Sequence, residues 1–391
     1  MSTLQVEGIR NAAASSDAIS LASNGSVSIA ATCTALQNNQ IKLINTISDT
    51  NMLINPHMQI DQRGLGTLTI NSSTGQYPVD PWVSRGEGGS KAFTVQQVAI
   101  SNQGLGVRHC VRVTSSQAAT LSANDIFNFR QMIEGYNIQR LNLGEAGCQS
   151  MTLSFTARSS VAGTHSGAIQ NSAQNKSYPF TYTLVANTWT DVTITIPPIT
   201  SGSFNETSGV GLRVIFDMGS GDNFRGTAGQ WNSAQDEGAT GAVRILENNG
   251  ATWEITKVQF EEGTIKSPTQ KRSYDDELRR CQRYFFMKAA GDGHPIGSGF
   301  WWSTSRFMCP CFFPVTMRTE TPGLYQVSGS QYFRIYDDTA SSHVFTSMAV
   351  NSQKSAHGIS LNCEGSLSSS AAAGFLWTNN AAARFGFDGE L

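Results

Sequence analysis

The chain has 391 residues, and only 14 % of them are charged, whereas about 25 % is usual in soluble globular domains. Its formal net charge of −2 excludes an overall electrostatic attraction for nucleic acid or for an anionic membrane. Glycine is abundant, at 37 residues, and Ser, Thr and Asn are frequent, which favours sheets joined by turns over helices. Two classes fit this composition, a soluble β enzyme and a β-rich structural or adhesive protein, and the low charge favours the second.

The N-terminus and the cysteines indicate in which cellular compartment the chain folds. MSTLQVEGIR has no basic start followed by an apolar core, so we expect no secretory signal peptide. No apolar run approaches the roughly 18 residues that a membrane-spanning helix needs. The seven cysteines are odd in number and scattered, which argues against a disulfide framework, and we expect folding in a reducing cytosol. In the one close pair, Cys309-Pro310-Cys311, we expect the side chains to point to opposite faces of a strand, with no metal bound.

Residues 1–51 are predicted to form a docking or oligomerisation segment. Within AISLASNGSVSIA, Asn24-Gly25 separates two alternating stretches, a pattern typical of a tight β-hairpin. Four apolar positions define its two strands: Ile19, Leu21, Val27 and Ile29. So few aliphatic residues bury too little surface for stability on their own. We therefore expect the hairpin to pack on copies of itself or on a partner, with packing on its own chain as the alternative.

Residues 32–51 connect this hairpin to the rest of the chain. Leu36, Leu43 and Ile47 recur at a spacing that fits a helix, but Asn, Thr and Ser are frequent between them. The segment is therefore predicted to be either a short helix or an extended linker.

Residues 52–266 are predicted to form one all-β domain, a jelly-roll-like sandwich of about eight to ten strands. Alternating apolar stretches recur between turn-rich segments, among them FTVQQVAI, SMTLSFTARS, WTDVTITIPPI and ATWEITKVQF. Three tryptophans are expected in its core: Trp82, Trp189 and Trp253. The stretch SGDNFRGTAGQWNSAQDEGATGAV is polar and rich in glycine, so we expect a long surface loop that carries binding groups.

A short connecting helix is predicted within residues 267–288. Ser273 is a good N-cap with Asp276 three residues on, and acidic residues fill the first turn while arginines fill the last. Four residues lie on one helical stripe: Tyr274, Leu278, Cys281 and Phe285. The stripe is expected either to pack on its own domain or to meet symmetry copies around an axis.

Residues 289–391 are predicted to form a second, smaller β-sandwich. Strand candidates include GFWWSTSR, CFFPVTM, YFRIYDD, HGISLNC and AAARFGFDGEL. The fold class expected for the whole chain is all-β: an N-terminal hairpin, a jelly-roll-like sandwich, a short helix and a second small sandwich.

Six stretches follow one another along the chain: NMLINPHMQIDQRG, YPVDPW, FRQMIEG, MTLSFTAR, RSYDDELRRCQRYF and ARFGFDGEL. In this order they resemble the motifs of a family of phage tail fibre and receptor-binding virion proteins. Thr156, within MTLSFTAR, stands where that family commonly has Trp. The start, MSTLQVEGIRN, resembles the virion-docking leader of marine and cyanobacterial phage fibres.

The resemblance implies a structural protein of the virion tail with a carbohydrate-binding-module-like sandwich at its centre. It also implies a homotrimer that is assembled in the host cytoplasm and docks through residues 1–51 on a tail adaptor, nozzle or hub protein. We expect no cofactor, no nucleic acid partner and no insertion into a membrane.

The sequence lacks the usual catalytic patterns. A glycan-cleaving enzyme needs two carboxylates about 5–10 Å apart across a groove. Glu261 and Glu262 are adjacent on a predicted strand and so are expected to face opposite sides, and Asp236-Glu237 lies in the polar loop. No G-x-S-x-G, H-E-x-x-H or P-loop occurs. We expect no enzymatic activity, with a tailspike depolymerase as the alternative.

Sugar binding needs exposed aromatic rings beside hydrogen-bonding amides or carboxylates. The first candidate is Trp231, between Gln230 and Asn232 in the polar loop; Tyr178 and the pair Trp301-Trp302 follow. Strand alternation is expected to point one tryptophan of the pair inward and to leave the other exposed or at an interface. The sequence thus predicts a virion fibre that attaches to host-surface glycan, and a decoration protein with no receptor role is the remaining alternative.

Overall fold

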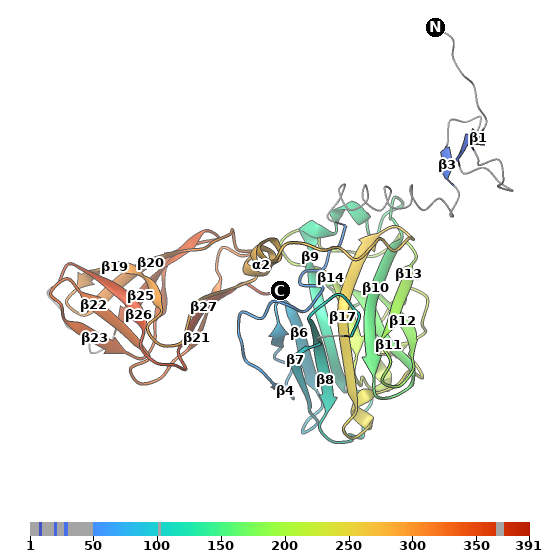
Figure 1. Ribbon diagram of the computed structural model, residues 1–391, viewed down its shortest axis with the longest axis horizontal. Helices are drawn as coiled ribbons and strands as arrows, with labels where there is room; N and C mark the ends of the chain where they lie inside the picture. Colours follow the sequence, from blue (N-terminus) through green and yellow to red (C-terminus); the bar gives the residue numbers. More distant parts are fainter. Residues whose placement is uncertain (1–7, 10–18, 22–26, 30–49, 101–102, 365–370) are drawn as a thin grey trace, which may run out of the picture. The chain divides into compact units, whose positions relative to one another are not determined.

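The computed structural model describes residues 50–100, 103–364 and 371–391, together with three short strands nearer the N-terminus. The chain divides into two units, one of Met1–Thr50 with Ser267–Gln270 and one of Asn51–Lys266 with Lys271–Leu391. The regular structure of the described residues is nearly all β, which confirms the predicted fold class (Figure 1). None of the described helices has the length and apolar character to cross a membrane.

The first unit contains a three-stranded sheet in the order β1 (Gly8–Ile9), β2 (Ile19–Leu21) and β3 (Val27–Ile29). β2 and β3 are antiparallel with Ile19 opposite Ile29, which confirms the two strands of the predicted hairpin. β1 adds a strand that the sequence patterns did not indicate. The Asn24-Gly25 turn and nearly all of the predicted connector, residues 32–51, lie outside the described residues.

The second unit begins with a sandwich of two six-stranded antiparallel sheets. From edge to edge, sheet I consists of β13 (Thr190–Ile196), β10 (Met151–Ser159), β17 (Thr252–Glu262), β8 (His109–Ser115), β7 (Phe93–Ala99) and β4 (Leu68–Ile70). Sheet II consists of β12 (Ser177–Leu184), β11 (Gly163–Asn171), β14 (Val210–Asp217), β9 (Ile126–Glu134), β6 (Trp82–Glu87) and β5 (Gln76–Val79). The connections hold a short parallel pair and four 3-10 turns: β15 (Arg225–Gly226), β16 (Gly238–Ala239), η1 (Gly135–Asn137), η2 (Gln139–Leu141), η3 (Asp222–Phe224) and η4 (Ile245–Glu247).

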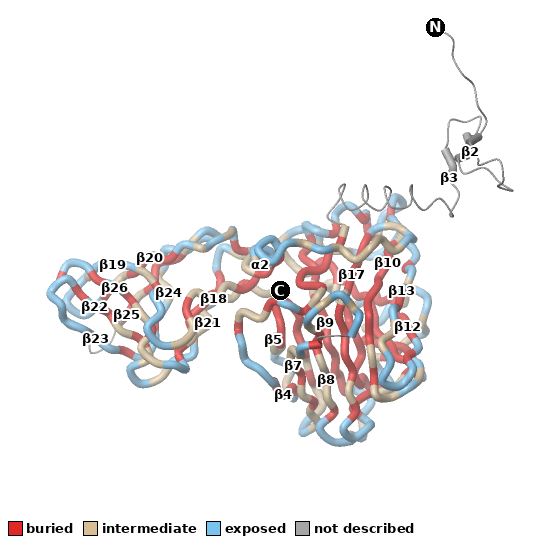
Figure 2. Tube along the Cα trace, in the orientation of Figure 1, coloured by how far each residue is buried: buried red, intermediate tan, exposed pale blue. Residues whose placement is uncertain are grey.

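Aromatic side chains fill the space between the two sheets. Strands such as β9, β10 and β17 are buried along most of their length (Figure 2). Trp82 stacks on Phe129 with ring centroids 5.1 Å apart. The indole N–H of Trp82 donates to the Ile54 carbonyl, and that of Trp253 donates to the Tyr182 hydroxyl. Burial of these two rings therefore leaves neither N–H without a partner.

Trp189 is not in this core, contrary to the expectation. It is half-buried and precedes β13 at the edge of sheet I. Its indole N–H donates to Gln103, and the guanidinium carbon of Arg158 lies 4.7 Å from its ring centroid. At this edge polar side chains cover the ring instead of the apolar interior.

Two further sheets form the C-terminal part of the second unit and share one apolar core. Sheet III consists of β18 (Phe285–Ala290), β27 (Arg384–Asp388) and β21 (Gly323–Val327). Sheet IV consists of β23 (Ser342–Phe345), β22 (Phe333–Asp337), β26 (Ala373–Thr378), β19 (Pro295–Ser303), β20 (Arg306–Phe312), β25 (Gly358–Glu364) and β24 (Ala349–Ser355). Strand β18 of sheet III begins inside the segment 267–288 that was predicted as the connecting helix.

Cys309 and Cys311 point to the same face of β20, and the expectation of opposite faces is wrong. Residues two apart on a strand share a face because side chains alternate with a period of two. Both thiols are buried in the C-terminal core with their Sγ atoms 4.0 Å apart. The six cysteines of the described residues are all free and buried.

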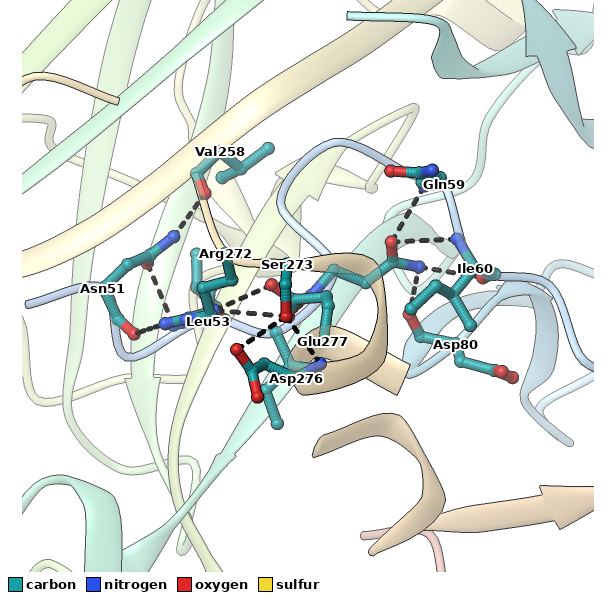
Figure 3. A network of polar contacts seen from close by, with 12 residues as sticks. Asn51, Leu53, Gln59, Ile60, Asp80, Val258, Arg272, Ser273, Asp276 and Glu277 are labelled. Carbon is teal, nitrogen blue, oxygen red and sulfur yellow. Dashed lines mark hydrogen bonds and ion pairs between the residues drawn. The ribbon is translucent and has the colours of Figure 1, made fainter. Parts of the chain in front are cut away.

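The predicted helix is present as α2 (Tyr274–Gln282), with Ser273 as its N-cap. The Ser273 hydroxyl accepts a hydrogen bond from the Asp276 N–H at 3.2 Å and donates one to the Asp276 carboxylate at 2.6 Å (Figure 3). This reciprocal cap satisfies a backbone donor that the first turn of a helix would otherwise leave unpaired.

Buried polar contacts tie the start of α2 to the segment that leads into the sandwich (Figure 3). Glu277 accepts a hydrogen bond from the Asn55 N–H at 2.6 Å and forms an ion pair with Arg272 at 3.1 Å. Arg272 also donates to the carbonyls of Asn51 at 2.6 Å and Leu53 at 3.2 Å. The helix is therefore fixed to residues 51–55, far away in the sequence.

The predicted stripe of α2 packs largely on its own chain. Cys281 is fully buried against Ile54 and Ile60, and Leu278 packs on the same cluster. Phe285 lies in β18 and is also fully buried, whereas Tyr274 is exposed. The alternative of symmetry copies along this stripe is therefore wrong for Cys281 and Phe285, because those side chains have no free surface to offer.

One buried cation joins the sandwich to the end of the chain. Arg63 forms an ion pair with Asp80 at 2.8 Å and another with Glu390 at 3.2 Å. Its guanidinium carbon lies 3.5 Å from the ring centroid of Phe285 and 4.4 Å from that of Tyr77. We call these five residues the Arg63 joint. Cation–π contacts and charge-assisted hydrogen bonds together compensate for the loss of water around the guanidinium.

A second polar contact joins the same two parts of the unit. Glu134, at the end of β9, accepts from Arg283 at 2.7 and 2.8 Å and from the Tyr284 hydroxyl at 2.8 Å. A bidentate pair of this kind fixes orientation as well as distance.

We predict that Glu390 makes the chain less stable as the pH rises. Burial raises the pKa of Glu390 to about 8, above its usual value near 4.3, despite the opposing effect of Arg63. Because the folded chain holds this proton more tightly, its contribution to stability is complete below about pH 4 and is lost as the pH rises through about 8. In urea unfolding between pH 5 and 9, Glu390→Gln should flatten the decline of the unfolding free energy, and Glu320→Gln at an exposed site should not. An unchanged slope in Glu390→Gln would contradict this.

We predict that Glu277→Ala costs more stability than Ser273→Ala. The first change leaves the buried Asn55 N–H without its acceptor and removes the carboxylate that pairs with Arg272, a loss of about 3 kcal/mol or more. The second removes only an exposed cap, a loss of about 1 kcal/mol. Chemical denaturation of both variants tests the order. Equal losses would mean that the buried contacts of Glu277 contribute nothing beyond helix capping.

Candidate functional site

The first predicted binding residue, Trp231, anchors its loop to the sandwich. Its ring is half-buried and lies 5.5 Å from the ring of Tyr178, centroid to centroid. Its indole N–H donates to the Pro197 carbonyl at 2.9 Å. Tyr178 is buried, and its hydroxyl is 3.4 Å from the Thr195 carbonyl oxygen. The structure thus places both rings together, with little of Tyr178 open to a ligand.

The polar neighbours of Trp231 bond within the loop. The Asn232 side chain donates to the Asp236 carboxylate at 2.8 Å, and its backbone pairs with Ser177. Gln230 is exposed and donates to the Asn232 side-chain oxygen at 3.1 Å. Of the predicted trio, Gln230 is the most accessible residue.

The polar stretch 220–243 is less of a surface loop than the sequence suggested. Asp236 and Glu237 are buried, and β16 within this stretch is buried against sheet II. A Cβ on Gly238 would lie 2.4 Å from the Asp217 carboxylate, so only glycine permits this close approach. The stretch therefore covers part of the outer face of sheet II.

Trp301 and Trp302 lie on opposite faces of β19, as strand alternation predicted. Trp301 packs against the C-terminal core, 5.5 Å from Phe307 and 5.1 Å from His343 between ring centroids. Trp302 is 65 % exposed. The sequence alone could not say what surrounds it.

Trp302 belongs to a wider group of exposed rings on the outer face of sheet IV. The members, from four of its strands, are Phe300, Trp302, Phe312, Tyr336 and Phe375. We call this group the aromatic face. The strand register places Tyr336 directly opposite Phe375, and the rings of Phe300 and Trp302 are 6.4 Å apart. Antiparallel sheets with one solvated face usually turn polar residues outward, so five exposed rings on one sheet are unusual.

A groove of about 570 Å³ opens beside these rings, where residues of β24 depart from regular pairing with β25. Its apolar lining includes Phe300, Met308, Pro310 and Phe312. Its polar lining is Gln353, Lys354, Ser355, His357 and Ser360. Flat rings beside amide, ammonium, hydroxyl and imidazole groups can stack on the apolar side of a ligand and hydrogen-bond to its edges.

The carboxylates named in the sequence are engaged in structural contacts. Glu261 is buried on β17 and accepts from Gln259, while Glu262 is exposed on the other side, as adjacent strand residues should be. Glu237 is buried and accepts from Asn128 at 2.8 Å. Within residues 50–100, 103–364 and 371–391, no three His, Cys, Asp or Glu side chains are grouped so as to hold a metal ion.

Comparisons with known proteins leave the family open. No family model matches the chain, and no curated protein matches it. Among solved structures it is similar to the enzymatically active domain of tailspike protein 4 of bacteriophage CBA120, with 11 % identity over 55 % of this chain and a TM-score of 0.28. That match spans 21 % of the tailspike domain.

Carbohydrate-binding modules are matched at similar levels. The chain is similar to TmCBM61, solved in complex with β-1,4-galactotriose, at 12 % identity over 54 % of this chain and 98 % of that one, with a TM-score of 0.28. It is also similar to a family 11 module from Clostridium thermocellum, at 10 % identity over 51 % of this chain and 98 % of that one, with a TM-score of 0.25. Identities and TM-scores this low establish neither a family nor an activity.

Proposed function

We propose that this chain is a non-enzymatic structural protein of a phage virion that binds a host-surface glycan through the aromatic face. In this proposal it is a homotrimeric tail fibre, and residues 1–51 dock it on the tail. The resemblance of six stretches to phage fibre proteins supports the virion role, and the aromatic face supports ligand binding.

The observation that carries the proposal is the exposure of five aromatic rings on a single sheet. Trp302 is 65 % exposed and Phe312 77 % exposed, yet both belong to regular strands whose neighbouring side chains fill a well-packed core. Largely exposed rings contribute less to the stability of an isolated domain than buried ones do, and an extended patch of them promotes association. Their grouping is therefore best explained by a ligand.

A glycan fits this surface better than a purely apolar partner does. The apolar faces of pyranose rings stack on flat aromatic side chains, while their hydroxyls need hydrogen-bonding groups at the edge. Gln353 and His357 stand beside the rings in the groove and can supply such groups. A membrane or a hydrophobic protein surface would not require them.

The N-terminal hairpin supports a docking role for residues 1–51. Its strands β2 and β3 are three residues long, and β1 is shorter still. A sheet of this size is marginal in water without further packing, so a partner or other copies of the chain would complete it.

We predict that Trp302→Ala weakens glycan binding at least about tenfold, which corresponds to the loss of about 1.4 kcal/mol from one stacked ring. The measurement is a glycan array followed by calorimetric titration of the best hit. Tyr136→Ala is the matched control, because Tyr136 is also an exposed aromatic but lies in η1 of the sandwich.

Three outcomes would change the proposal. If Trp231→Ala abolishes binding while the chain stays folded and Trp302→Ala does not, the site lies in the sandwich loop. Release of reducing ends from the bound glycan would favour a depolymerase. Absence of any glycan hit, with light scattering that shows no trimer of the 42.1 kDa chain, would favour a decoration protein.

A further inference from the structure

Three arginines share the outer face of sheet II, away from the aromatic face. Arg130 lies in β9, between Phe129 and Gln131, and Phe129 points into the core. Side chains alternate, so Arg130 points outward. Arg85 on β6 pairs with Asn128, and Arg213 on β14 pairs with Met132. Both partners lie two residues from Arg130 and therefore on its face. We call Arg85, Arg130 and Arg213 the arginine cluster.

Arg130 is buried without a partner. It is 9 % exposed, its Nε and Nη1 atoms meet no acceptor, and no ion pair involves it within the described part of the chain. The guanidinium groups of Arg85 and Arg213 are only partly paired. Arg85 pairs with Glu87, and Arg213 donates to the carbonyls of Asn171 and Ser172. The Nε atoms of both are left buried and unpaired.

The cluster carries an excess of positive charge. Burial, and then the charges of Arg130 and Arg85, lower the pKa of Arg213 to about 10, although Glu237 opposes this. The pKa of Arg130 is likewise lowered, first by burial. Glu237 is the nearby buried carboxylate, but it accepts from Asn128 and forms no ion pair with the cluster among the described residues. A buried guanidinium without a counter-charge costs several kcal/mol, so the site favours an added anion.

Unpaired acceptors stand beside these unpaired donors. The side-chain oxygens of Asn128 and Gln170 are both buried and receive no hydrogen bond. Asn128 is two residues from Arg130 on β9, and Gln170 pairs with Arg213 across β11 and β14. A simple inorganic anion would satisfy the guanidinium groups and leave these amide oxygens unpaired. A ligand with both an anionic group and hydroxyl donors would satisfy all of them.

We propose that the arginine cluster binds the carboxylate of an acidic sugar, such as a hexuronic acid, with Asn128 and Gln170 accepting hydrogen bonds from its hydroxyls. The guanidinium fork matches a carboxylate in bidentate geometry. The proposal rests on the proposed glycan-binding function only for the choice of a sugar as the bearer of the carboxylate. It adds a second site, on the sandwich, to the one on sheet IV.

The test is calorimetric titration of the full chain with sodium glucuronate at constant ionic strength, with glucose and sodium phosphate as comparison probes. We expect saturable glucuronate binding that Arg130→Met weakens at least tenfold. Arg108→Met, which removes an exposed arginine of the same sandwich, should leave it unchanged. Thermal unfolding gives a second readout, because glucuronate should raise the midpoint of the wild type but not of Arg130→Met.

Several results would overturn this site. They are no saturable glucuronate binding, equal binding by Arg130→Met, or phosphate binding as tight as that of glucuronate. If Arg130→Met fails to fold, Arg213→Gln replaces it in the same comparison. Loss of glucuronate binding in Trp302→Ala but not in Arg130→Met would assign the acidic sugar to the aromatic face instead. If the chain binds glucuronate but binds no glycan on the array, the aromatic face is refuted as a glycan site and the arginine cluster is supported.

Discussion

The arrangement of the second unit depends on the burial of one cation, Arg63. Asp80 from the sandwich forms an ion pair with it, Glu390 from the end of the chain lies within hydrogen-bonding distance, and the rings of Tyr77 and Phe285 cover it. Burying a guanidinium with only part of this surround would cost several kcal/mol. Neither the sandwich nor the C-terminal part surrounds Arg63 by itself. Compensation of the Arg63 charge therefore holds the two parts together, in addition to apolar contact.

Several of the stretches that resemble phage fibre motifs contribute residues to this same region, among them Arg63, Asp80 and Glu390. In FRQMIEG, the Gln131 side chain bonds to both the N–H and the carbonyl of Ile54, and Glu134 receives Arg283 and Tyr284. A Cβ on Gly135 would lie 2.4 Å from the Asn205 carbonyl oxygen, so this position requires glycine. These motif residues thus have a structural explanation, the joining of the sandwich to the C-terminal sheets. They say little about ligands, and such packing does not explain Arg130, whose Nε and Nη1 atoms are buried without an acceptor.

Sequence patterns predicted the elements whose signals are local. The cap of α2, the two strands of the hairpin and the alternating strand β10 were all accessible in this way. β11 was missed because two of the positions that share the core face with Ile169 are His165 and Gly167, so the sequence shows no apolar alternation there. The stretch CFFPVTM was expected as a strand, but after Phe312 the chain turns at Pro314.

The candidate sites were only partly predictable for the same reason. Alternation correctly predicted that one ring of Trp301-Trp302 is exposed. The aromatic face and the arginine cluster each depend on the register of strands far apart in the chain, which no local pattern encodes. Trp231 looked exposed because its neighbours are polar, but those neighbours bond to one another and let the ring pack against Tyr178.

Cys281 lies on the buried face of α2, and its thiol can therefore report on local opening of the chain. The thiol has no exposed surface, and burial raises its pKa well above the usual value. Only the thiolate reacts readily with alkylating agents and oxidants. In the folded chain its modification therefore has to wait until the helix separates from Ile54 and Ile60, and the rate of labelling at this one atom reports how often that local opening occurs.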